Sequence, residues 1–417
     1  MKSNYKRIGD YIKVLNNRNY DMKTDTLLGI NIDKYFMPSV ANVVGTDLSA
    51  YKLVQKNQFA CNRMHVGRDH KLPIAKSKSD CEFIVSPAYD VFEINDTIVL
   101  NPDYLMMWFS RKEFDRNAWY YTDADVRGGL SLSSFHDMKL PIPSIEKQRE
   151  IVTEYQVIQN RIENNQKLIQ KLEETAQAVY KQWFVEFEFP ISKEYAEEIE
   201  LSEVEGKPYK SNGGEMVWCE ELGKEIPRGW EVKPFTQIVT LSGGGTPDTN
   251  KEKYWNGDIP FFSPADVVDS YYSIYTEKNI SELGLKNSST KLYPMNTVFV
   301  TARGTVGAIS IAGCQMTMNQ SCYAITGRND MNQYFAHQIT LSAIEKLKNE
   351  AVGAVFAALV TKNFDSQILI EPEKILIKSF GKKIKPIYDY ILNIVKENQK
   401  LSELKDLLLS KLATVEG

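Results

Sequence analysis

The sequence has few of the residues from which catalytic and metal sites are usually built. It contains four histidines and five cysteines in 417 residues, and no two cysteines form a C-x-x-C pair. An odd number of cysteines without such a pair indicates neither a disulfide framework nor a zinc site. We therefore expect free thiols in a reducing cytoplasm. The sequence also lacks a G-x-S-x-G motif, so it gives no catalytic triad to propose.

Long apolar runs are absent as well. The longest run, AVGAVFAALV at 351–360, has ten residues and contains a glycine. That is too short to cross a bilayer. The first ten residues lack the apolar stretch of a signal peptide. We therefore expect a cytoplasmic protein with no membrane partner.

Three short stretches resemble catalytic motifs but are incomplete. SGGGTP (242–247) lacks the lysine of a phosphate-binding loop, which favours a flexible loop after a strand. NPDY (101–104) and SPAY (86–89) lack the second proline of the amino-methyltransferase motif. In NPDY, Asn101 and Pro102 suit the N-cap and first residue of a helix better. We expect a chain that is not an enzyme and binds no cofactor itself.

The charge of the chain is unevenly distributed. Residues 186–225 contain twelve glutamates and four lysines, a net charge of −8, whereas the whole chain carries −4. The remaining residues therefore carry a net charge of +4. We interpret residues 186–225 as an acidic linker, and we expect any anion-binding surface elsewhere to be local and mild.

Two similar helical phrases occur far apart in the chain. ENNQKLIQKLEE (163–174) and ENQKLSELKDLL (397–408) each lie in a region whose apolar positions alternate in steps of three and four. This is the heptad spacing of a coiled-coil seam. We predict two long antiparallel helices, 144–185 and 373–417. The residues expected to pair them are Ile158, Ile162, Asn165, Ile169, Leu172, Ile387, Ile391, Ile394, Asn398 and Leu401.

The two asparagines occupy equivalent positions near the middle of each predicted helix. A pseudo-twofold pairing would place Asn165 opposite Asn398, where a buried polar pair fixes the register at some cost in stability. Alternatively, both asparagines lie on an exposed flank. The periodicity alone leaves both arrangements open.

The repeat extends beyond the helices. LPIPSIEK (140–147) aligns with LIEPEKIL (369–376), and NQFACNRMHVG (57–67) aligns with TVFVTARGTVG (297–307). Each half is rich in short β-prone runs, which predicts an α+β fold of two mixed α/β domains with a pseudo-twofold internal repeat. The predicted segments are domain 1 at 1–143, a spacer helix at 144–185, the acidic linker at 186–225, domain 2 at 226–372 and a second spacer helix at 373–417.

Each domain has polar residues suited to nucleic-acid contact. The stretch 63–78 of domain 1 is basic with Asp69 as its only acid, which suits phosphate contact or, equally, a solvated loop. In domain 2 an arginine and two amides could read bases, or could be an ion-paired arginine and two turn amides. The candidate DNA-binding residues are Arg63, Arg68, Lys71, Lys76, Lys251, Lys253, Tyr254, Arg303, Asn319 and Gln320.

An ordered series of motifs resembles the specificity (S) subunit of type I restriction-modification systems. The series covers most of residues 140–270, and the internal repeat extends the resemblance to nearly the whole chain. The motifs are LPIPSIEKQREIV (140–152), WFVEFEFP (183–190), GKPYKSNGGEMVW (206–218), IPRGWEVKPF (226–235), LSGGGTP (241–247) and YWNGDIPFFSPADV (254–267).

This resemblance implies a function in DNA recognition. Each of two target recognition domains would read one half of a bipartite double-stranded DNA target, with the two helices as a ruler between them. The family is not catalytic; it docks two methyltransferase (M) subunits, and restriction (R) subunits complete the complex. S-adenosylmethionine, ATP and Mg would be bound by those partners. The alternatives are a coiled-coil scaffold that binds proteins and a degenerate DNA methyltransferase.

Overall fold

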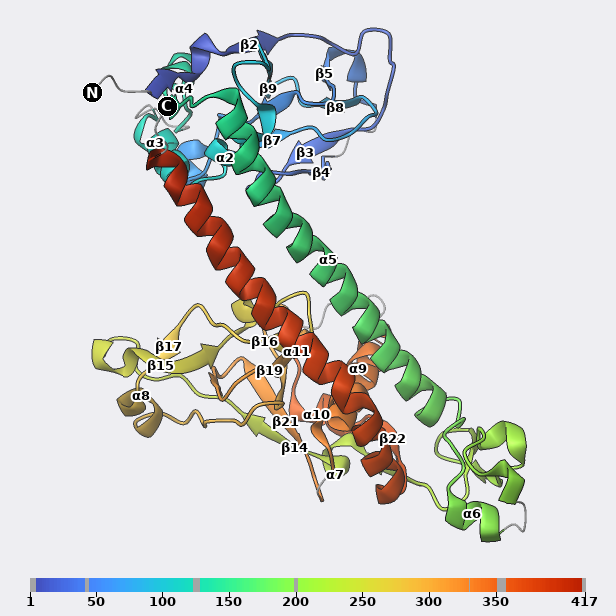
Figure 1. Cartoon of the computed structure of the whole chain (residues 1–417). Helices are drawn as coiled ribbons and strands as arrows, with labels where there is room; N and C mark the ends of the chain where they lie inside the picture. Colours follow the sequence, from blue (N-terminus) through green and yellow to red (C-terminus); the bar gives the residue numbers. More distant parts are fainter. Residues whose placement is uncertain are drawn as a thin grey trace. The chain divides into compact units, whose positions relative to one another are not determined.

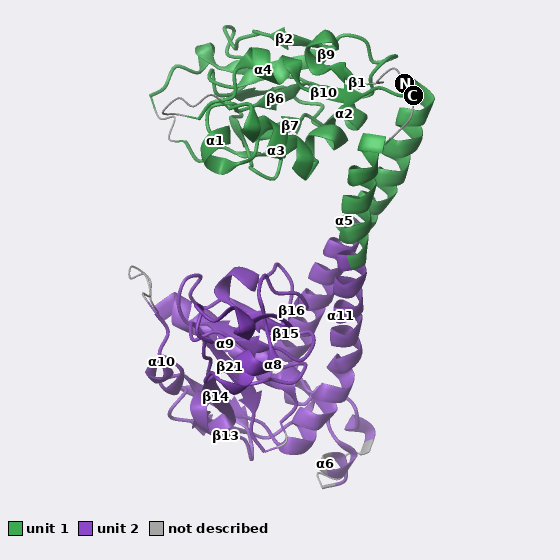
Figure 2. Cartoon of the chain, turned by 90° about the vertical axis from the view of Figure 1, so that its left-hand side faces the viewer, with its two compact units in different colours: residues 1–163, 400–417 green, residues 164–399 purple. Residues whose placement is uncertain are grey.

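The chain folds into two compact units. The computed structural model describes residues 5–41, 45–122, 128–198, 202–329, 331–350 and 358–414. Unit 1 comprises residues 1–163 and 400–417, and unit 2 comprises residues 164–399 (Figure 2). Two long helices, α5 (Ile145–Phe184) and α11 (Lys374–Lys411), are labelled in Figure 1. Both contribute residues to both units (Figure 2).

The bounds of the long helices agree closely with the sequence prediction. Helix α5 begins and ends one residue inside the predicted 144–185. Helix α11 begins one residue after the predicted start and is followed by a 3-10 turn, η7 (Leu412–Thr414). The last three predicted residues, 415–417, lie outside the described residues. Two mixed units joined through two long helices are the α+β architecture expected from the repeat.

Unit 1 is built on a four-stranded antiparallel sheet. Its strand order is β2-β9-β6-β7. A separate pair, β1 with β10, ties the start of the unit to the segment that leads into α5. The sheet strands are β2 (Ile12–Leu15), β9 (Asp90–Ile94), β6 (Phe59–Cys61) and β7 (Ile74–Lys76); the outer pair is β1 (Tyr5–Arg7) and β10 (Lys139–Pro141).

The other elements of unit 1 surround this sheet. Two further antiparallel pairs, β3 with β4 and β5 with β8, extend the unit. As predicted, the Asn101 side chain caps α2, and it accepts hydrogen bonds from the backbone of Asp103 and Tyr104. The remaining elements are η1 (Ile8–Asp10), β3 (Leu28–Ile30), β4 (Phe36–Pro38), η2 (Leu48–Ala50), β5 (Lys52–Val54), α1 (Val66–Asp69), β8 (Phe83–Val85), α2 (Pro102–Phe109), α3 (Lys112–Tyr120) and α4 (Leu132–Asp137).

Aromatic side chains fill the core of unit 1. Phe59 of β6 lies opposite Phe92 of β9 in the strand register, and the two rings are stacked with centroids 5.1 Å apart. Phe109 of α2 meets both rings edge-on. Because cross-strand pairs of this kind stabilise sheets and fix their register, this cluster aligns β6 with β9.

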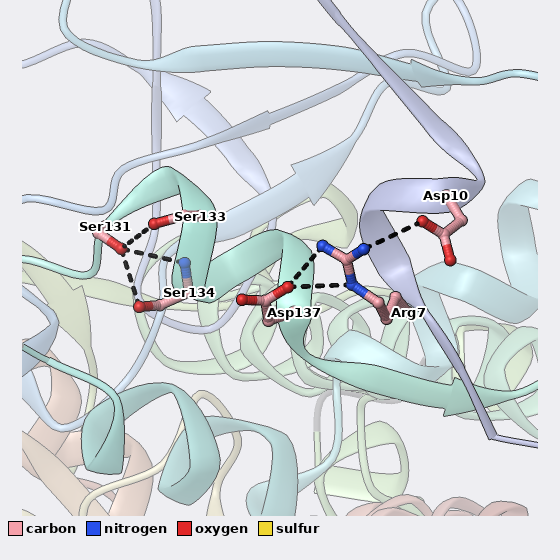
Figure 3. Close-up of polar contacts among 6 residues, drawn as sticks. All are labelled: Arg7, Asp10, Ser131, Ser133, Ser134 and Asp137. Carbon is pink, nitrogen blue, oxygen red and sulfur yellow. Dashed lines mark hydrogen bonds and ion pairs between the residues drawn. The ribbon is translucent and has the colours of Figure 1, made fainter.

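A polar corner fastens α4 to the first strand of unit 1. Figure 3 shows the Arg7 guanidinium between Asp10 and Asp137, with Arg7 Nη2 2.6 Å from Asp137 Oδ1. The Ser131 hydroxyl accepts from the backbone N–H of Ser134 at 3.0 Å, which caps the N-terminus of α4 (Figure 3). These contacts hold the segment that leads into β10 and α5.

Unit 2 repeats the sheet of unit 1 with one additional strand. Its order is β14-β21-β18-β19-β16, and the first four strands have the same mutual pairing as β2-β9-β6-β7. Here too an outer antiparallel pair, β13 with β22, leads into a long helix. The strands are β14 (Val239–Gly243), β21 (Cys322–Gly327), β18 (Val298–Thr301), β19 (Ile309–Ala312), β16 (Tyr272–Ser273), β13 (Glu231–Pro234) and β22 (Ile368–Glu371). The internal repeat is therefore a repeat of strand pairing.

Unit 2 also has elements outside these strands. A second sheet has the order β17-β15-β20, and α9 packs against β18 and β21. These elements are α6 (Lys193–Glu198), η3 (Ser202–Val204), η4 (Lys210–Asn212), β11 (Met216–Cys219), β12 (Lys224–Pro227), α7 (Phe235–Ile238), η5 (Glu252–Tyr254), β15 (Trp255–Phe262), η6 (Pro264–Asp266), β17 (Asn279–Ile280), α8 (Glu282–Lys286), β20 (Thr317–Met318), α9 (Gln333–Glu350) and α10 (Thr361–Asp365).

The acidic segment 186–225 is folded, so its interpretation as a plain linker is corrected. The described part contains α6, two 3-10 turns and the β11-β12 hairpin. The ring of Phe189 stacks on Tyr209 at 4.5 Å and on Trp230 at 5.2 Å. Phe189 and Tyr209 are both part of the buried core of unit 2. The many glutamates are typical of a solvent-exposed linker, so the burial of these aromatic residues could not be predicted from the composition.

The two long helices meet through an asparagine pair in unit 2. Asn165 Nδ2 donates to Asn398 Oδ1 at 2.8 Å and lies 3.2 Å from Glu397 Oε2. The asparagines therefore face each other rather than lying on an exposed flank. Ile169, Ile391 and Ile394 are buried in the core of unit 2. Of the other pairing candidates, Leu172 and Ile387 pack against that core, Ile158 and Ile162 are buried in unit 1, and Leu401 is half-buried there.

Candidate nucleic-acid interface

The basic stretch of unit 1 follows strand β6 and passes through the short helix α1. Its path is fixed by a close backbone approach: Gly67 N–H donates to Gly128 O at 2.7 Å. A Cβ on Gly67 would lie 2.8 Å from the Cα of Gly128, so a larger residue does not fit there. Leu130 N–H donates to the Arg63 carbonyl at 2.9 Å. The loop is thus held against a second segment of the same unit.

Arg63 is engaged inside unit 1. Its Nε lies 2.6 Å from Asp90 Oδ2, and its Nη1 donates to the Leu130 carbonyl. The Arg63 side chain is 20% exposed and that of Asp90 is 18% exposed. Through its Nε and Nη1, Arg63 joins the end of β6 to β9 and to the segment before α4.

The other basic residues predicted in unit 1 are also paired with aspartates. Arg68 Nε lies 2.6 Å from Asp69 Oδ1, and this hydrogen bond lowers the pKa of Asp69. The remaining pairs are Lys71 with Asp33 at 3.1 Å and Lys76 with Asp103 at 2.6 Å.

Within residues 63–78 Asp69 is the only acid, as the sequence shows, but acids from elsewhere in the chain also lie beside this stretch. The fold brings Asp33, Asp90 and Asp103 to it from other segments. The Lys76 side chain is only 6% exposed, so we do not include it in the proposed interface. Arg68 and Lys71 are partly solvent-accessible and remain predicted contacts.

Arg303 of unit 2 follows strand β18 and has a different environment. The neighbouring Ala302 is fixed on both sides, because its N–H donates to Ser321 O at 2.7 Å and its carbonyl accepts from Leu359 N–H at 2.9 Å. Gly304 has a φ of +79° and turns the chain directly after Arg303. Arg303 is exposed, and no described residue forms a hydrogen bond or ion pair with its side chain. The backbone at this position is ordered while the guanidinium faces solvent.

The glycine-rich stretch SGGGTP packs tightly against the turn that contains Asn319 and Gln320. Gly245 N–H donates to Met318 O at 3.2 Å, and the Thr246 hydroxyl donates to Gln320 Oε1. A Cβ on Gly244 would lie 2.0 Å from Asn319 O, so this close approach requires glycine. The prediction of a flexible loop is therefore wrong, because this stretch packs against the turn and supports it.

The two amides of that turn have different surroundings. Asn319 Oδ1 accepts from Ser321 N–H at 2.9 Å, which makes Asn319 a turn-forming amide. Gln320 is exposed. Ala302 follows β18 and is hydrogen-bonded to Ser321, which precedes β21. Arg303 and Gln320 are the next residues beyond this hydrogen bond on the two antiparallel segments. The structure therefore brings these two predicted residues together.

The third predicted group in unit 2 surrounds a buried tyrosine. Lys251 Nζ and Lys253 Nζ lie 5.3 and 5.8 Å from the centroid of the Tyr254 ring. Lys251 also lies 3.6 Å from Asp248. Tyr254 is 6% exposed, so it supports η5 and presents the lysines instead of a free aromatic face. Both lysines are exposed and remain predicted phosphate contacts.

Comparison with known proteins shows which family the chain resembles. Residues 227–406 match the family model described as "Type I restriction modification DNA specificity domain". The HindI specificity subunit of Haemophilus influenzae is 26% identical over 423 residues, which covers 91% of each chain. The chain is thus similar to type I restriction-modification specificity subunits, over residues 227–406 for the family model and over 91% of its length for this relative. The family resemblance noted in the sequence is thereby confirmed.

Other specificity subunits show the same similarity. The MjaIX specificity subunit of Methanocaldococcus jannaschii is 26% identical over 297 residues, covering 69% of this chain and 64% of that protein. The crystal structure of an S subunit from M. genitalium shares the fold, with a TM-score of 0.53, 13% identity, and coverage of 99% of this chain and 96% of that one.

Metal-binding clusters and membrane-spanning helices are both absent from the described residues. Within the described ranges, no three or more histidine, cysteine, aspartate or glutamate side chains are grouped as they would be around a metal ion. In the same part of the chain, no helix is both long and apolar enough to cross a membrane.

Proposed function

We propose that this chain is a type I specificity subunit that reads a bipartite double-stranded DNA target, with one half-site for each unit. The observation that carries the proposal is the repeated strand pairing, β2-β9-β6-β7 in unit 1 and β14-β21-β18-β19 in unit 2. The same backbone presents different polar residues in the two units. Two readers of unlike sequences require this combination of a common scaffold and unlike side chains.

The exposed cations suit the sequence-independent part of DNA binding. Arg68 and Lys71 in unit 1 and Lys251 and Lys253 in unit 2 would contact phosphates. Such contacts position a protein on the duplex without reading its sequence. The mild charge of the chain outside residues 186–225 agrees with a few local contacts instead of a continuous basic face.

The long helices would set the number of base pairs between the half-sites. Helix α5 contains 40 residues, a length of about 60 Å at 1.5 Å per residue. One turn of B-DNA is about 34–36 Å. A helix of this length suits a gap of between one and two turns.

The proposal extends to the partners and to the absence of catalysis. The chain would dock two methyltransferase subunits, which bind S-adenosylmethionine, and restriction subunits that use ATP and Mg would complete the assembly. The relatives' names support this, because both curated relatives are called specificity subunits of restriction enzymes. The complex would act in the cytoplasm in host defence.

Mapping of methylated adenines in the host genome tests the proposal. We expect one bipartite motif with a fixed gap to be methylated in the presence of the gene, lost on deletion and restored by the wild-type gene. An unchanged methylation pattern, together with no methyltransferase recovered on the tagged chain, would contradict the proposal and favour the scaffold. S-adenosylmethionine binding by the isolated chain would favour the degenerate methyltransferase.

A further inference from the structure

The internal repeat allows residue-by-residue comparison of the two units at the end of their third sheet strand. Phe59 of β6 aligns with Phe299 of β18 in the repeat, and each strand pairs antiparallel with the strand on its inner side. Four residues further along, Arg63 aligns with Arg303. The two arginines therefore occupy equivalent positions on the same scaffold.

The partner of Arg63 follows from the strand register. Cys61 lies opposite Asp90 in the β6-β9 pair, and the Asp90 carboxylate holds Arg63 Nε at 2.6 Å. The Leu130 carbonyl accepts from Arg63 Nη1. These contacts use two of the five guanidinium N–H groups, and the Arg63 side chain is only 20% exposed, so it is held inside the unit and away from a base edge.

The equivalent position in unit 2 has no carboxylate. Thr301 lies opposite Cys322 in the β18-β21 pair, so Cys322 stands where unit 1 has Asp90. Cys322 is 1% exposed, in an apolar cluster with Phe299 and Ala324. No charge at this position can hold the arginine.

The acid near Cys322 is already engaged elsewhere. Burial and, after it, the nearby charge of Asp266 raise the pKa of Cys322. Asp266 accepts from Ser263 N–H and Oγ–H at 2.8 and 2.6 Å and from Glu277 N–H at 2.6 Å. These contacts occupy both of its carboxylate oxygens. Arg303 thus keeps its donors free in the described part of unit 2, beside the exposed Gln320.

We propose that Arg303 is a specificity-determining residue that reads a guanine in the half-site of unit 2, whereas Arg63 is a positioning residue of the unit 1 fold. The inference rests on the proposed function. An arginine with free donors matches the O6 and N7 acceptors of guanine in the major groove. A phosphate contact requires only a cation, whereas reading a base requires a fixed position and matched donors and acceptors. The fixed backbone of Arg303 and the neighbouring Gln320 amide therefore suit a base edge.

The test compares substitutions at both positions in the full chain, expressed with its methyltransferase partners in cells. The readouts are the methylated motif, the affinity for matched and mismatched duplexes, and the unfolding temperature of the purified chain. Arg303→Ala should relax one guanine position in one half-site, with a roughly 10- to 100-fold loss of discrimination there. The other half-site and the unfolding temperature should stay unchanged. Arg303→Lys should have a similar effect, because lysine lacks the planar fork.

Controls on other arginines complete the comparison. Arg63→Ala should lower the unfolding temperature and leave every base of the motif unchanged, and the milder Arg63→Lys gives the same test if the alanine variant does not fold. Arg328→Ala, an exposed arginine of unit 2 whose Nε donates to Thr240 Oγ1 at 3.2 Å, should change neither motif nor stability.

A further variant converts unit 2 toward the arrangement of unit 1. Cys322→Asp should copy the effect of Arg303→Ala, while Cys322→Ser should not. Cys322 is buried, so an aspartate there can prevent folding. The Arg303 variants test the inference whether or not this variant folds.

Three outcomes would overturn the inference. The motif could survive Arg303→Ala unchanged, or all duplexes could bind more weakly by the same factor, which would make Arg303 a phosphate contact. A base change in the motif of Arg63→Ala or Arg63→Lys would overturn the role given to Arg63. If the wild-type chain directs no bipartite methylation, the proposed function itself fails, which is a distinct result.

Discussion

The two units share a sheet but use their basic residues differently. In unit 1, Arg63, Arg68 and Lys71 are each paired with an aspartate. In unit 2, the equivalent of Arg63 is Arg303, and its side chain has no partner among the described residues. Strand order and pairing are therefore conserved while the ion pairs are not. Equivalent positions in a repeat do not by themselves indicate equivalent roles, because a single cross-strand neighbour can change the role.

The largest expected effect comes from breaking a buried ion pair of unit 1. Lys34 Nζ lies 2.7 Å from Asp115 Oδ1, with side chains 7% and 11% exposed, and Asp115 also accepts from Leu72 N–H at 3.1 Å. Asp115→Ala should lower the free energy of unfolding of unit 1 by about 3–5 kcal/mol, since it leaves a buried ammonium unpaired. Urea denaturation measures this. Asp10→Ala, at an exposed pair, is the matched control, and an equal loss in both variants would contradict the prediction.

The asparagine pair in the helix seam should give the next largest effect. Asn165→Leu should destabilise unit 2 by about 1–3 kcal/mol, because Asn398 would lose its partner in a largely buried seam. The double variant with Asn398→Leu should regain most of that loss. In unit 1 the corresponding polar contact, Lys405 Nζ to Gln159 Oε1, is longer at 3.4 Å, so Gln159→Leu should cost less. Thermal unfolding of the wild type, Asn165→Leu, the double variant and Gln159→Leu tests this prediction. If stability were not regained in the double variant, the pairing of the two asparagines would be contradicted.

The stability of unit 2 should depend on pH through Glu173. Burial raises the pKa of Glu173 to about 7, although its carboxylate accepts from Tyr271 N–H at 2.7 Å. The stabilising contribution of a raised carboxyl pKa is complete below the ordinary pKa and is lost as the pH rises through about 7. Burial also lowers the pKa of His337 to about 3, and its contribution is lost in the opposite direction, as the pH falls below its ordinary range.

Substitution of Glu173 isolates its part of that dependence. Glu173→Gln keeps an acceptor for Tyr271 N–H and removes the charge, so it should raise the unfolding temperature at about pH 8 more than at about pH 5. Glu174→Gln, at the exposed neighbouring position, should show no such difference. A shift of equal size at both pH values would contradict the role of Glu173.

The smallest effect is expected from freeing a surface arginine of unit 1. Asp69→Asn removes the carboxylate that binds Arg68 Nε at 2.6 Å. DNA should then bind somewhat more tightly on all sequences, and the salt dependence of binding should steepen by about one counterion. Binding measured at several salt concentrations tests this, with Asp10→Asn as the control (Figure 3). An unchanged slope would show that Arg68 does not contact phosphate.

The sequence predicted the long helices and the repeat because these depend on local pattern. Heptad spacing defined α5 and α11 to within a few residues, and the capped start at Asn101 was correct. Pairing across the sheet could not be predicted in the same way. Asp90 is 27 residues from Arg63, and only the β6-β9 register brings the two side chains together. For the same reason the sequence could not show that Arg63 is ion-paired while Arg303 has no partner among the described residues.

Two other features depended on tertiary contacts. The heptad pattern allowed Asn165 to face its partner or solvent, and only helix pairing decides between them. SGGGTP was read as flexible because it is rich in glycine. Its glycine at 244 is instead required by the 2.0 Å approach that a Cβ would make to Asn319 O. Composition predicts neither burial nor close packing at such positions.

The folded acidic segment also influences how a duplex can approach unit 2. Residues 186–225 carry twelve glutamates and four lysines, and Phe189 anchors the segment in the core. Double-stranded DNA carries one negative charge per roughly 1.7 Å of its axis. Repulsion between the two anionic surfaces disfavours collisions in which DNA meets this segment first. We therefore expect the segment to restrict the productive directions of encounter before any base is contacted.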